Sequence, residues 1–166
     1  LAIIPARKNS KIIKNKNLRK IGNKSLVEIS LFSALRSKYV SQVCITSDSK
    51  KILSIAKKID NKVVLINRPK NLANSIIMPD AAVIHAYNQI NKKFDYIVML
   101  QPTSIFRDSH DIDLAIKKII NDKADSLISV TKTHNFFWEK VNKFYKPINY
   151  KPASRPRSQD FEQFKE

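Results

Sequence analysis

Five short apolar runs alternate with segments of helical periodicity, and this alternation constrains the fold more than any other feature of the chain. The apolar runs cover residues 1–5, 43–46, 63–66, 96–100 and 126–130. The helical segments between them, with apolar side chains every three or four residues, cover 26–38, 50–59, 81–90 and 108–120. Such alternation is typical of a parallel sheet between helices. We therefore predict an α/β fold: a Rossmann-like, mostly parallel sheet with helices on both faces.

A cationic, amide-rich loop follows the first apolar run. No acidic residue occurs before Glu28, and the basic residues of the loop are Arg7, Lys8, Lys11, Lys14 and Lys16. A strand that delivers such a loop can hold a polyphosphate, because N–H groups supply donors and the cations offset the ligand's charge. The alternative is a solvated surface loop in a lysine-rich protein.

Polar residues also stand where the other predicted strands end. The four ends carry Ala6-Arg7, Ser47-Asp48, Asn67-Arg68 and the run from Gln101 to Ser104. Ligands of open α/β sheets bind beyond the carboxyl ends of the strands, where these residues converge. With Lys16 and Arg107 nearby in the chain, we predict an anion-binding site at this edge.

Composition fits one ordinary globular domain. The chain has 166 residues, of which 43% are hydrophobic, and no apolar stretch approaches the roughly 18 residues of a membrane span. The single cysteine, Cys44, lies in an apolar run and is interpreted as a buried thiol in a reducing compartment. We see no signal peptide and expect a cytoplasmic protein. The chain begins without methionine and ends without a terminating feature, so we expect a piece of a longer protein.

The net charge of +17 favours anionic partners such as nucleotides, acidic sugars or nucleic acid. Abundant Lys, Asn and Ile are also the residue usage of an AT-rich genome, and this alternative stays open. Gly22 is the only glycine, so we expect Asn to occupy loop positions that need a positive φ.

The order of the motifs resembles a known family. The pieces are Ile4-Pro5-Ala6-Arg7, Ser10-Lys11, Lys16-Asn17-Leu18, Thr46-Ser47-Asp48, Arg68-Pro69, Leu100-Gln101-Pro102-Thr103-Ser104 with Arg107, and Arg155-Pro156-Arg157 with Gln159-Asp160. Together they resemble the acylneuraminate cytidylyltransferases, or CMP-sialic acid synthetases, including those for legionaminic and pseudaminic acid. The resemblance implies a fold of the nucleotide-diphospho-sugar transferase type.

The resemblance also implies a reaction. The family joins CTP to a nine-carbon 2-keto sugar acid and releases pyrophosphate with Mg²⁺ present, for cell-surface polysaccharide biosynthesis. The sugar's anomeric hydroxyl attacks the α-phosphate, which is a matter of positioning and charge stabilisation. The expected partners are CTP, the acidic sugar and a second copy of the chain, with neither a membrane nor a specific nucleic acid.

Family roles transfer onto matching positions. Arg7 and Lys16 are the implied catalytic residues. The implied nucleotide-binding residues are Ala6, Arg7, Asn9, Ser10, Lys16, Asn17 and Arg68. The implied sugar-binding residues are Gln101, Ser104, Arg157 and Gln159. The family's metal-binding aspartates are expected beyond Glu166; within the chain Asp48 is a weak metal candidate that we interpret as a helix N-cap.

The last part of the chain departs from the alternating pattern. Residues 132–166 contain clustered aromatic side chains and three prolines. We interpret them as an irregular excursion of a single domain spanning 1–166, one that covers the substrate or mediates dimerisation. Three alternatives remain: a cytidylyltransferase for the eight-carbon lipopolysaccharide sugar acid, a basic nucleic-acid-binding protein, and a folded but inactive piece.

Overall fold

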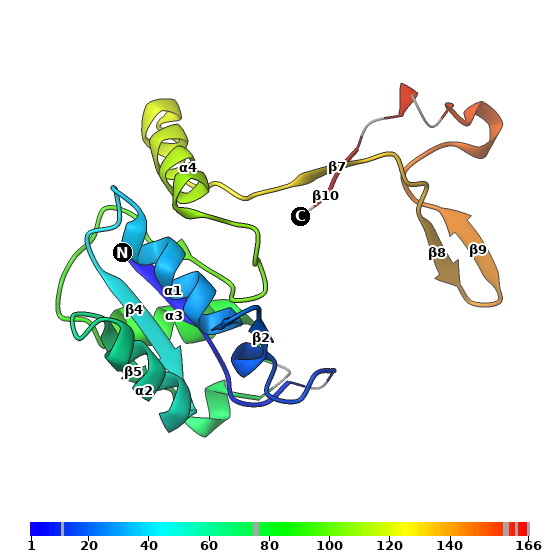
Figure 1. The fold of residues 1–166 in the computed structure, drawn as a ribbon. Helices are drawn as coiled ribbons and strands as arrows, with labels where there is room; N and C mark the ends of the chain where they lie inside the picture. The colour runs from blue at the N-terminus through cyan, green and yellow to red at the C-terminus, as the bar shows by residue number, and fades with distance from the viewer. Residues whose placement is uncertain (11, 75–76, 158–159, 162, 166) are drawn as a thin grey trace. The chain divides into compact units, whose positions relative to one another are not determined.

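The N-terminal apolar run forms a central strand of a four-stranded parallel sheet (Figure 1). The computed structural model describes the chain except for residues 11, 75–76, 158–159, 162 and 166. The strand order is β5-β4-β1-β6, and every pair is parallel. The strands are β1 (Ala2–Pro5), β4 (Val43–Ser47), β5 (Val64–Asn67) and β6 (Val98–Met99). The predicted α/β class is confirmed.

Helices cover both faces of this sheet, because successive side chains of β1 point to opposite sides. Ala2 and Ile4 pack in one apolar cluster with α1 (Leu26–Arg36), α2 (Lys50–Ile59) and α4 (Ser109–Asp122). Ile3 packs on the other face with Cys44 and with Ala86 of α3 (Pro79–Asn88). These side chains of β1 are fully buried, so the strand that delivers the cationic loop is fixed in the core.

Local signals set the helix starts. Ser25 caps α1 together with Glu28, whose carboxylate accepts a hydrogen bond from the backbone amide of Ser25 at 2.7 Å. Helix α2 has the predicted bounds, and Ser49 caps it by accepting from the amide of Ile52 at 3.4 Å. Helix α3 begins two residues earlier than predicted because Pro79 takes the first helical position, which suits its fixed φ.

Short elements connect these parts. They are the 3₁₀ turns η1 (Lys16–Leu18) and η2 (Lys70–Leu72) and the antiparallel pair β2 (Lys20–Ile21) and β3 (Lys24–Ser25). Among the described non-glycine residues, Asn15, Lys123 and Asn142 have positive φ. Asparagine at two of these positions confirms the expectation drawn from the single glycine.

The chain divides into two compact units, Leu1–Asp122 and Lys123–Glu166. The second unit contains the antiparallel pair β7 (Thr131–Thr133) and β10 (Gln163–Lys165), the hairpin β8 (Trp138–Val141) and β9 (Phe144–Pro147), and η3 (Pro152–Ser154). Phe136 stacks on Phe161 with ring centroids 4.9 Å apart, and the guanidinium of Arg155 lies 4.4 Å from the Phe136 centroid.

The fifth predicted strand, residues 126–130, is wrong. These residues are not in a strand, and Ile128 and Val130 are 62% and 47% exposed. An apolar run identifies a segment able to form a strand but does not supply a partner for it. In the part of the chain that the structure describes, β6 extends over only two residues and pairs with β1 alone.

No helix in the described parts of the chain combines the length and the apolarity needed to cross a membrane.

Candidate active site at the carboxyl edge of the sheet

A polar hollow of about 260 Å³ lies at the carboxyl ends of the parallel strands. The described residues that line it come from five segments: Pro5, Arg7, Lys16, Asn17, Arg68, Leu72, Asn74, Ile77, Met78, Pro79, Ala82, Gln101, Pro102 and Thr103. Three of them are cations, and none of the described lining residues is acidic. The hollow therefore offers an environment for an anionic ligand.

Arg7 reaches from the end of β1 to the segment that follows β5. Its Nη1 donates to the backbone oxygen of Asn74 at 3.0 Å. The backbone oxygen of Arg7 accepts a hydrogen bond of 2.8 Å from Nδ2 of Asn17, a residue that is only 6% exposed. The amide of Asn17 thus holds the main chain of the cationic loop, and the guanidinium of Arg7 lies at the wall of the hollow.

The loop is also tied to β4. The backbone amide of Lys8 donates to Oδ1 of Asp48 at 2.6 Å, and the amide of Ala6 donates to the oxygen of Thr46 at 3.0 Å. The interpretation of Asp48 as a helix N-cap is wrong, because Ser49 fills that position. The carboxylate of Asp48 serves instead to anchor the loop.

Arg68 is buried at the rim of the hollow, with 6% of its surface exposed. Its Nη2 donates to the backbone oxygen of Thr46 at 2.8 Å. Burial lowers the pKa of the Arg68 guanidinium; Asp48 opposes this shift, and Arg7 adds to it. An arginine stays protonated in proteins all the same, so this side chain brings a desolvated positive charge to the site.

Lys16 is half-buried in η1, whose first amide donates to the oxygen of Ile13 at 3.1 Å. Its neighbour in the same loop, Lys14, is exposed and does not line the hollow. The loop therefore contains one cation directed to the hollow by a helical turn and another on its surface.

On the far side, Gln101 to Thr103 follow β6 and form the opposite wall. The loop turns sharply here, since the amide of Ser104 donates to the oxygen of Gln101 at 3.2 Å. Ser104 is exposed and stands outside the lining.

The structure thus brings together five of the residues proposed from sequence: Arg7, Lys16, Asn17, Arg68 and Gln101. Four others stand outside the lining: Ala6, Asn9, Ser10 and Ser104. The amide of Ala6 is used by β4, and Asn9 is exposed. Arg157 belongs to the second unit, where its Nε donates to Asp160 at 2.6 Å. Gln159 lies outside the described residues.

Sequence reasoning missed an apolar part of the lining. It is contributed by the segment after β5 and the start of α3: Leu72, Ile77, Met78, Pro79 and Ala82. Their position in the sequence could have indicated this, since these residues lie between the predicted strand end at Arg68 and the predicted helix that follows, or at the start of that helix. A hollow with one cationic and one apolar side can hold a ligand that has both a phosphate chain and a flat ring.

A protein-held metal site does not fit the described residues. Among them there is no group of three or more His, Cys, Asp or Glu side chains placed to hold an ion. Asp48 is a single carboxylate already engaged by the amide of Lys8. Mg²⁺ in nucleotide sites uses one or two carboxylates together with substrate phosphates, so Asp48 would supply one ligand at most and the phosphates the others.

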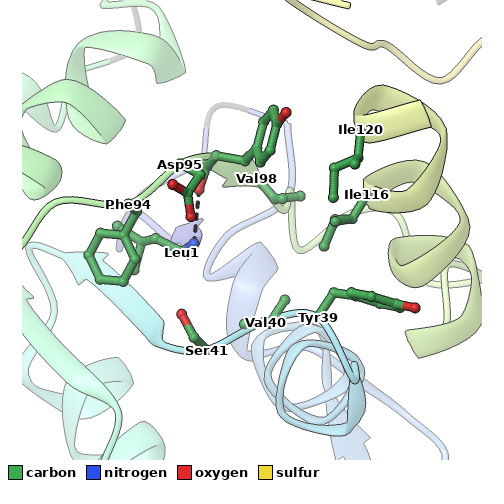
Figure 2. A pocket seen from close by; sticks show the side chains of 10 residues that line it. Leu1, Tyr39, Val40, Ser41, Phe94, Asp95, Val98, Ile116 and Ile120 are labelled. Carbon is green, nitrogen blue, oxygen red and sulfur yellow. Dashed lines mark hydrogen bonds between the residues drawn. The ribbon is translucent and has the colours of Figure 1, made fainter. Parts of the chain in front are cut away.

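A second hollow, of about 450 Å³, lies at the opposite end of the sheet, where β1 and β6 begin. Figure 2 shows Ile116 and Ile120 of α4 facing it together with Tyr39 and Val98. Its walls are mainly apolar, and its described lining residues do not include a group of cations like that at the carboxyl edge.

Comparison with known proteins identifies the family of this chain. A family model described as cytidylyltransferase matches residues 1–157. The chain belongs to the cytidylyltransferase family. The match covers every described strand of the parallel sheet and each described residue that lines the polar hollow.

Curated relatives include the N-acylneuraminate cytidylyltransferase of Escherichia coli, 34% identical over 135 residues, which are 81% of this chain and 32% of the relative. The CMP-N,N'-diacetyllegionaminic acid synthase of Legionella pneumophila is 31% identical, over 79% of this chain and 57% of the relative. The pseudaminic acid cytidylyltransferase of Campylobacter jejuni is 30% identical, over 80% and 58%. The chain thus spans between a third and somewhat over half of the length of these relatives.

Solved structures share the fold. CMP:2-keto-3-deoxy-manno-octonic acid synthetase complexed with CTP superposes with a TM-score of 0.67 at 16% identity, over 99% of this chain and 70% of that one. A 4-diphosphocytidyl-2C-methyl-D-erythritol synthase gives 0.69 at 12% identity, also over 99% and 70%.

Proposed function

We propose that this protein transfers CMP from CTP to a nonulosonic, sialic-acid-like sugar acid and releases pyrophosphate. The observation that carries the proposal is the convergence of Arg7, Lys16 and Arg68, from three separate segments, on one hollow whose described lining residues include no acidic side chain. Membership of the cytidylyltransferase family supports CTP as the nucleotide. The curated relatives named for sialic, legionaminic and pseudaminic acid support the class of acceptor.

In the proposed reaction, the anomeric oxygen of the sugar acid attacks the α-phosphorus of CTP. The bond to the bridging oxygen breaks, pyrophosphate leaves with the electron pair, and the hydroxyl proton passes to solvent or phosphate. Arg7 and Lys16 stabilise the charge that develops on the triphosphate, and their half-buried setting strengthens this effect. Positioning supplies the rest, since both reactants are held at one edge of a rigid sheet.

The other predicted site residues take supporting roles in this proposal. Arg68 and Asn17 hold the nucleotide side, Asn17 through its bond to the Arg7 backbone. The backbone around Asn9 and Ser10 contributes donors to the phosphates. Gln101 contacts the sugar acid, with Ser104 beside it, and Arg157 and Gln159 are further proposed sugar contacts. The guanidinium of Arg157 or of Arg68 has the geometry that matches the carboxylate of the acid.

We further propose that Mg²⁺ enters with the triphosphate and offsets its charge. Because Asp48 is the only acidic side chain of the described residues tied to the cationic loop, the phosphates would supply most of the ligands. The complete protein is proposed to act as a cytoplasmic homodimer. The hairpin of β8 and β9 supports the homodimer, because it exposes large apolar side chains that a second copy could cover. Trp138, Phe144 and Tyr145 are 53%, 78% and 65% exposed on it.

The test measures pyrophosphate release by the full-length protein with CTP and Mg²⁺, over sialic, legionaminic, pseudaminic and eight-carbon sugar acids. We expect turnover with one nine-carbon acid and its loss in Arg7→Ala. Arg36→Ala is the matched control, since Arg36 is exposed at the end of α1 and contacts Phe32. Turnover only with the eight-carbon acid would support the alternative function, a cytidylyltransferase for the eight-carbon lipopolysaccharide sugar acid. Silence with every acid, together with salt-sensitive binding to nucleic acid, would refute the proposal.

A further inference from the structure

The loop that forms the sugar side of the hollow is held from behind by Arg107. This arginine lies between β6 and α4, and its guanidinium donates in two directions. Nη1 donates to the backbone oxygen of Gln101 at 3.3 Å, and Nη2 donates to Oγ of Ser30 on α1 at 3.0 Å. One side chain therefore links the turn at Gln101 to a helix of the core.

The main chain of the loop is fastened to the same helix. Oγ of Ser33 lies 3.0 Å from the backbone oxygen of Arg107 and 3.0 Å from that of Ile29 in its own helix, so its single proton donates to one of the two at a time. Ser30 and Ser33 are both buried, at 0% and 8% exposure, and stand about one turn apart on α1. Within the loop, the amides of Ser104 and Arg107 donate to the oxygens of Gln101 and Ser104 at 3.2 and 3.4 Å. The two serines and the arginine form one connected set, which we name the loop anchor.

The loop anchor would be an unfavourable arrangement if its role were stability alone. Nε of Arg107 is buried without a hydrogen-bond partner among the described residues. Those residues also provide no ion pair for its guanidinium. Burial lowers the pKa of Arg107, and the carboxylate of Asp111 opposes this shift. Apolar side chains of similar volume commonly replace buried charges without loss of stability, so a purely structural role leaves the charge unexplained.

We propose that Arg107 is a positioning residue that fixes the wall from Gln101 to Thr103 for the acidic sugar. Through the Gln101 oxygen it sets where this wall stands, and it keeps a positive charge behind the wall without a direct ion pair among the described residues. Arg107 itself does not line the hollow, so it acts through Gln101 and not by contact. The substrate assignment rests on the proposed function, whereas the ordering of the loop does not.

The test uses the full-length protein and four variants: Arg107→Gln, Arg107→Lys, Ser30→Ala and, as a matched control, Arg36→Gln at the exposed end of α1. We expect Arg107→Gln to raise the KM for the sugar acid roughly tenfold, about the value of one or two charge-assisted hydrogen bonds. The Kd for CTP should stay within about twofold, because the cationic side of the hollow is untouched. Arg107→Lys restores part of the loss, and Ser30→Ala shows a smaller loss in the same direction.

Hydrogen exchange supplies a readout that does not need turnover. In Arg107→Gln the amides of residues 103–107 should exchange faster while those of α2 and β4 keep the wild-type rate. Unchanged exchange in this loop would overturn the proposal, even for a protein silent with every sugar acid. Equal losses of CTP and sugar affinity together with a lowered Tm would also overturn the proposal, since they would show that Arg107 has a structural role only. Faster exchange together with silence would leave the anchor standing and refute only the proposed function.

Discussion

The backbone amide of Lys8 donates to Oδ1 of Asp48 at 2.6 Å, and this bond ties the cationic loop to the end of β4 across 40 residues of sequence. The bond gives Asp48 an anchoring role that needs a hydrogen-bond acceptor but not a negative charge. A metal ligand would need the charge. The two roles can therefore be separated by substitution.

We expect Asp48→Ala to weaken CTP binding by about threefold to tenfold, the value of one lost hydrogen bond that orders the loop. Asp48→Asn keeps an oxygen acceptor and should bind CTP as well as the wild type does. Calorimetric titration of CTP with and without Mg²⁺ measures both. If Asp48→Asn loses binding only when Mg²⁺ is present, the carboxylate is a metal ligand; if Asp48→Ala binds CTP as well as the wild type without Mg²⁺, the anchoring role is refuted.

Substitution of Asn17 should lower stability and CTP affinity more than substitution of its neighbours in the loop. Asn17→Ala leaves the oxygen of Arg7 without its donor in a partly buried place, which costs about 1–2 kcal/mol. Urea denaturation should show this loss of unfolding free energy, and CTP affinity should fall with it. Asn15→Ala is the control, although its φ of 54° adds a small strain of its own. Wild-type stability in Asn17→Ala would contradict the buried hydrogen bond.

Asp113 makes stability depend on pH. Its Oδ1 accepts from Ser37 at 2.6 Å and from the amide of Lys38 at 3.0 Å, joining α4 to the end of α1. The hydrogen bond from Ser37 is the largest cause that lowers the pKa of Asp113, and burial opposes it. Because the pKa of Asp113 is lower in the folded protein, the ionised carboxylate stabilises the fold at pH values above its unfolded pKa of about 3.9. This stabilisation is lost as the pH falls through the folded pKa.

The pH dependence is tested with Asp113→Asn. The variant should be less stable than the wild type at neutral pH, and the difference should shrink below about pH 4. Urea denaturation across that range measures it, with the exposed Asp125→Asn as control. A difference that stays constant down to pH 2 would show that the charge of Asp113 contributes nothing.

Cys44 should report unfolding. It is fully buried in β4, and burial raises the pKa of its thiol to about 12. The thiolate that reacts with disulfide reagents is therefore scarce in the folded protein. We expect no labelling of the native chain over minutes at neutral pH and complete labelling in denaturant. Fast native labelling would show that the sheet opens readily.

The sequence predicted the framework of the first unit well, because burial there follows local periodicity. The bounds of α2 and the cap at Ser25 depend on neighbouring residues in the chain. The predicted strand at 126–130 failed because an apolar run contains no information about its partner. Pairing is decided by the rest of the sheet.

The part of the candidate site that lies directly at the strand ends was predictable, because the carboxyl ends of parallel strands meet at one edge of the sheet. This rule brought Arg7, Arg68 and Gln101 to one edge. It could not show that Asn74 accepts from Arg7 or that Asp48 accepts from Lys8, since both bonds depend on how loops cross the sheet edge. Nor could it show that Arg107 stands behind the wall of the hollow.

The central claim is that the hollow at the carboxyl edge binds CTP, and two lysines of one loop test it most directly. Lys16 lines the hollow, and Lys14 is exposed outside it. The measurement is the Kd for CTP of wild type, Lys16→Ala and Lys14→Ala at about 50 and 200 mM salt. We predict a loss of roughly tenfold or more for Lys16→Ala at both concentrations and less than about twofold for Lys14→Ala. Equal losses for the two lysines that vanish at high salt would contradict the claim and leave only a diffuse attraction of a cationic protein for polyanions.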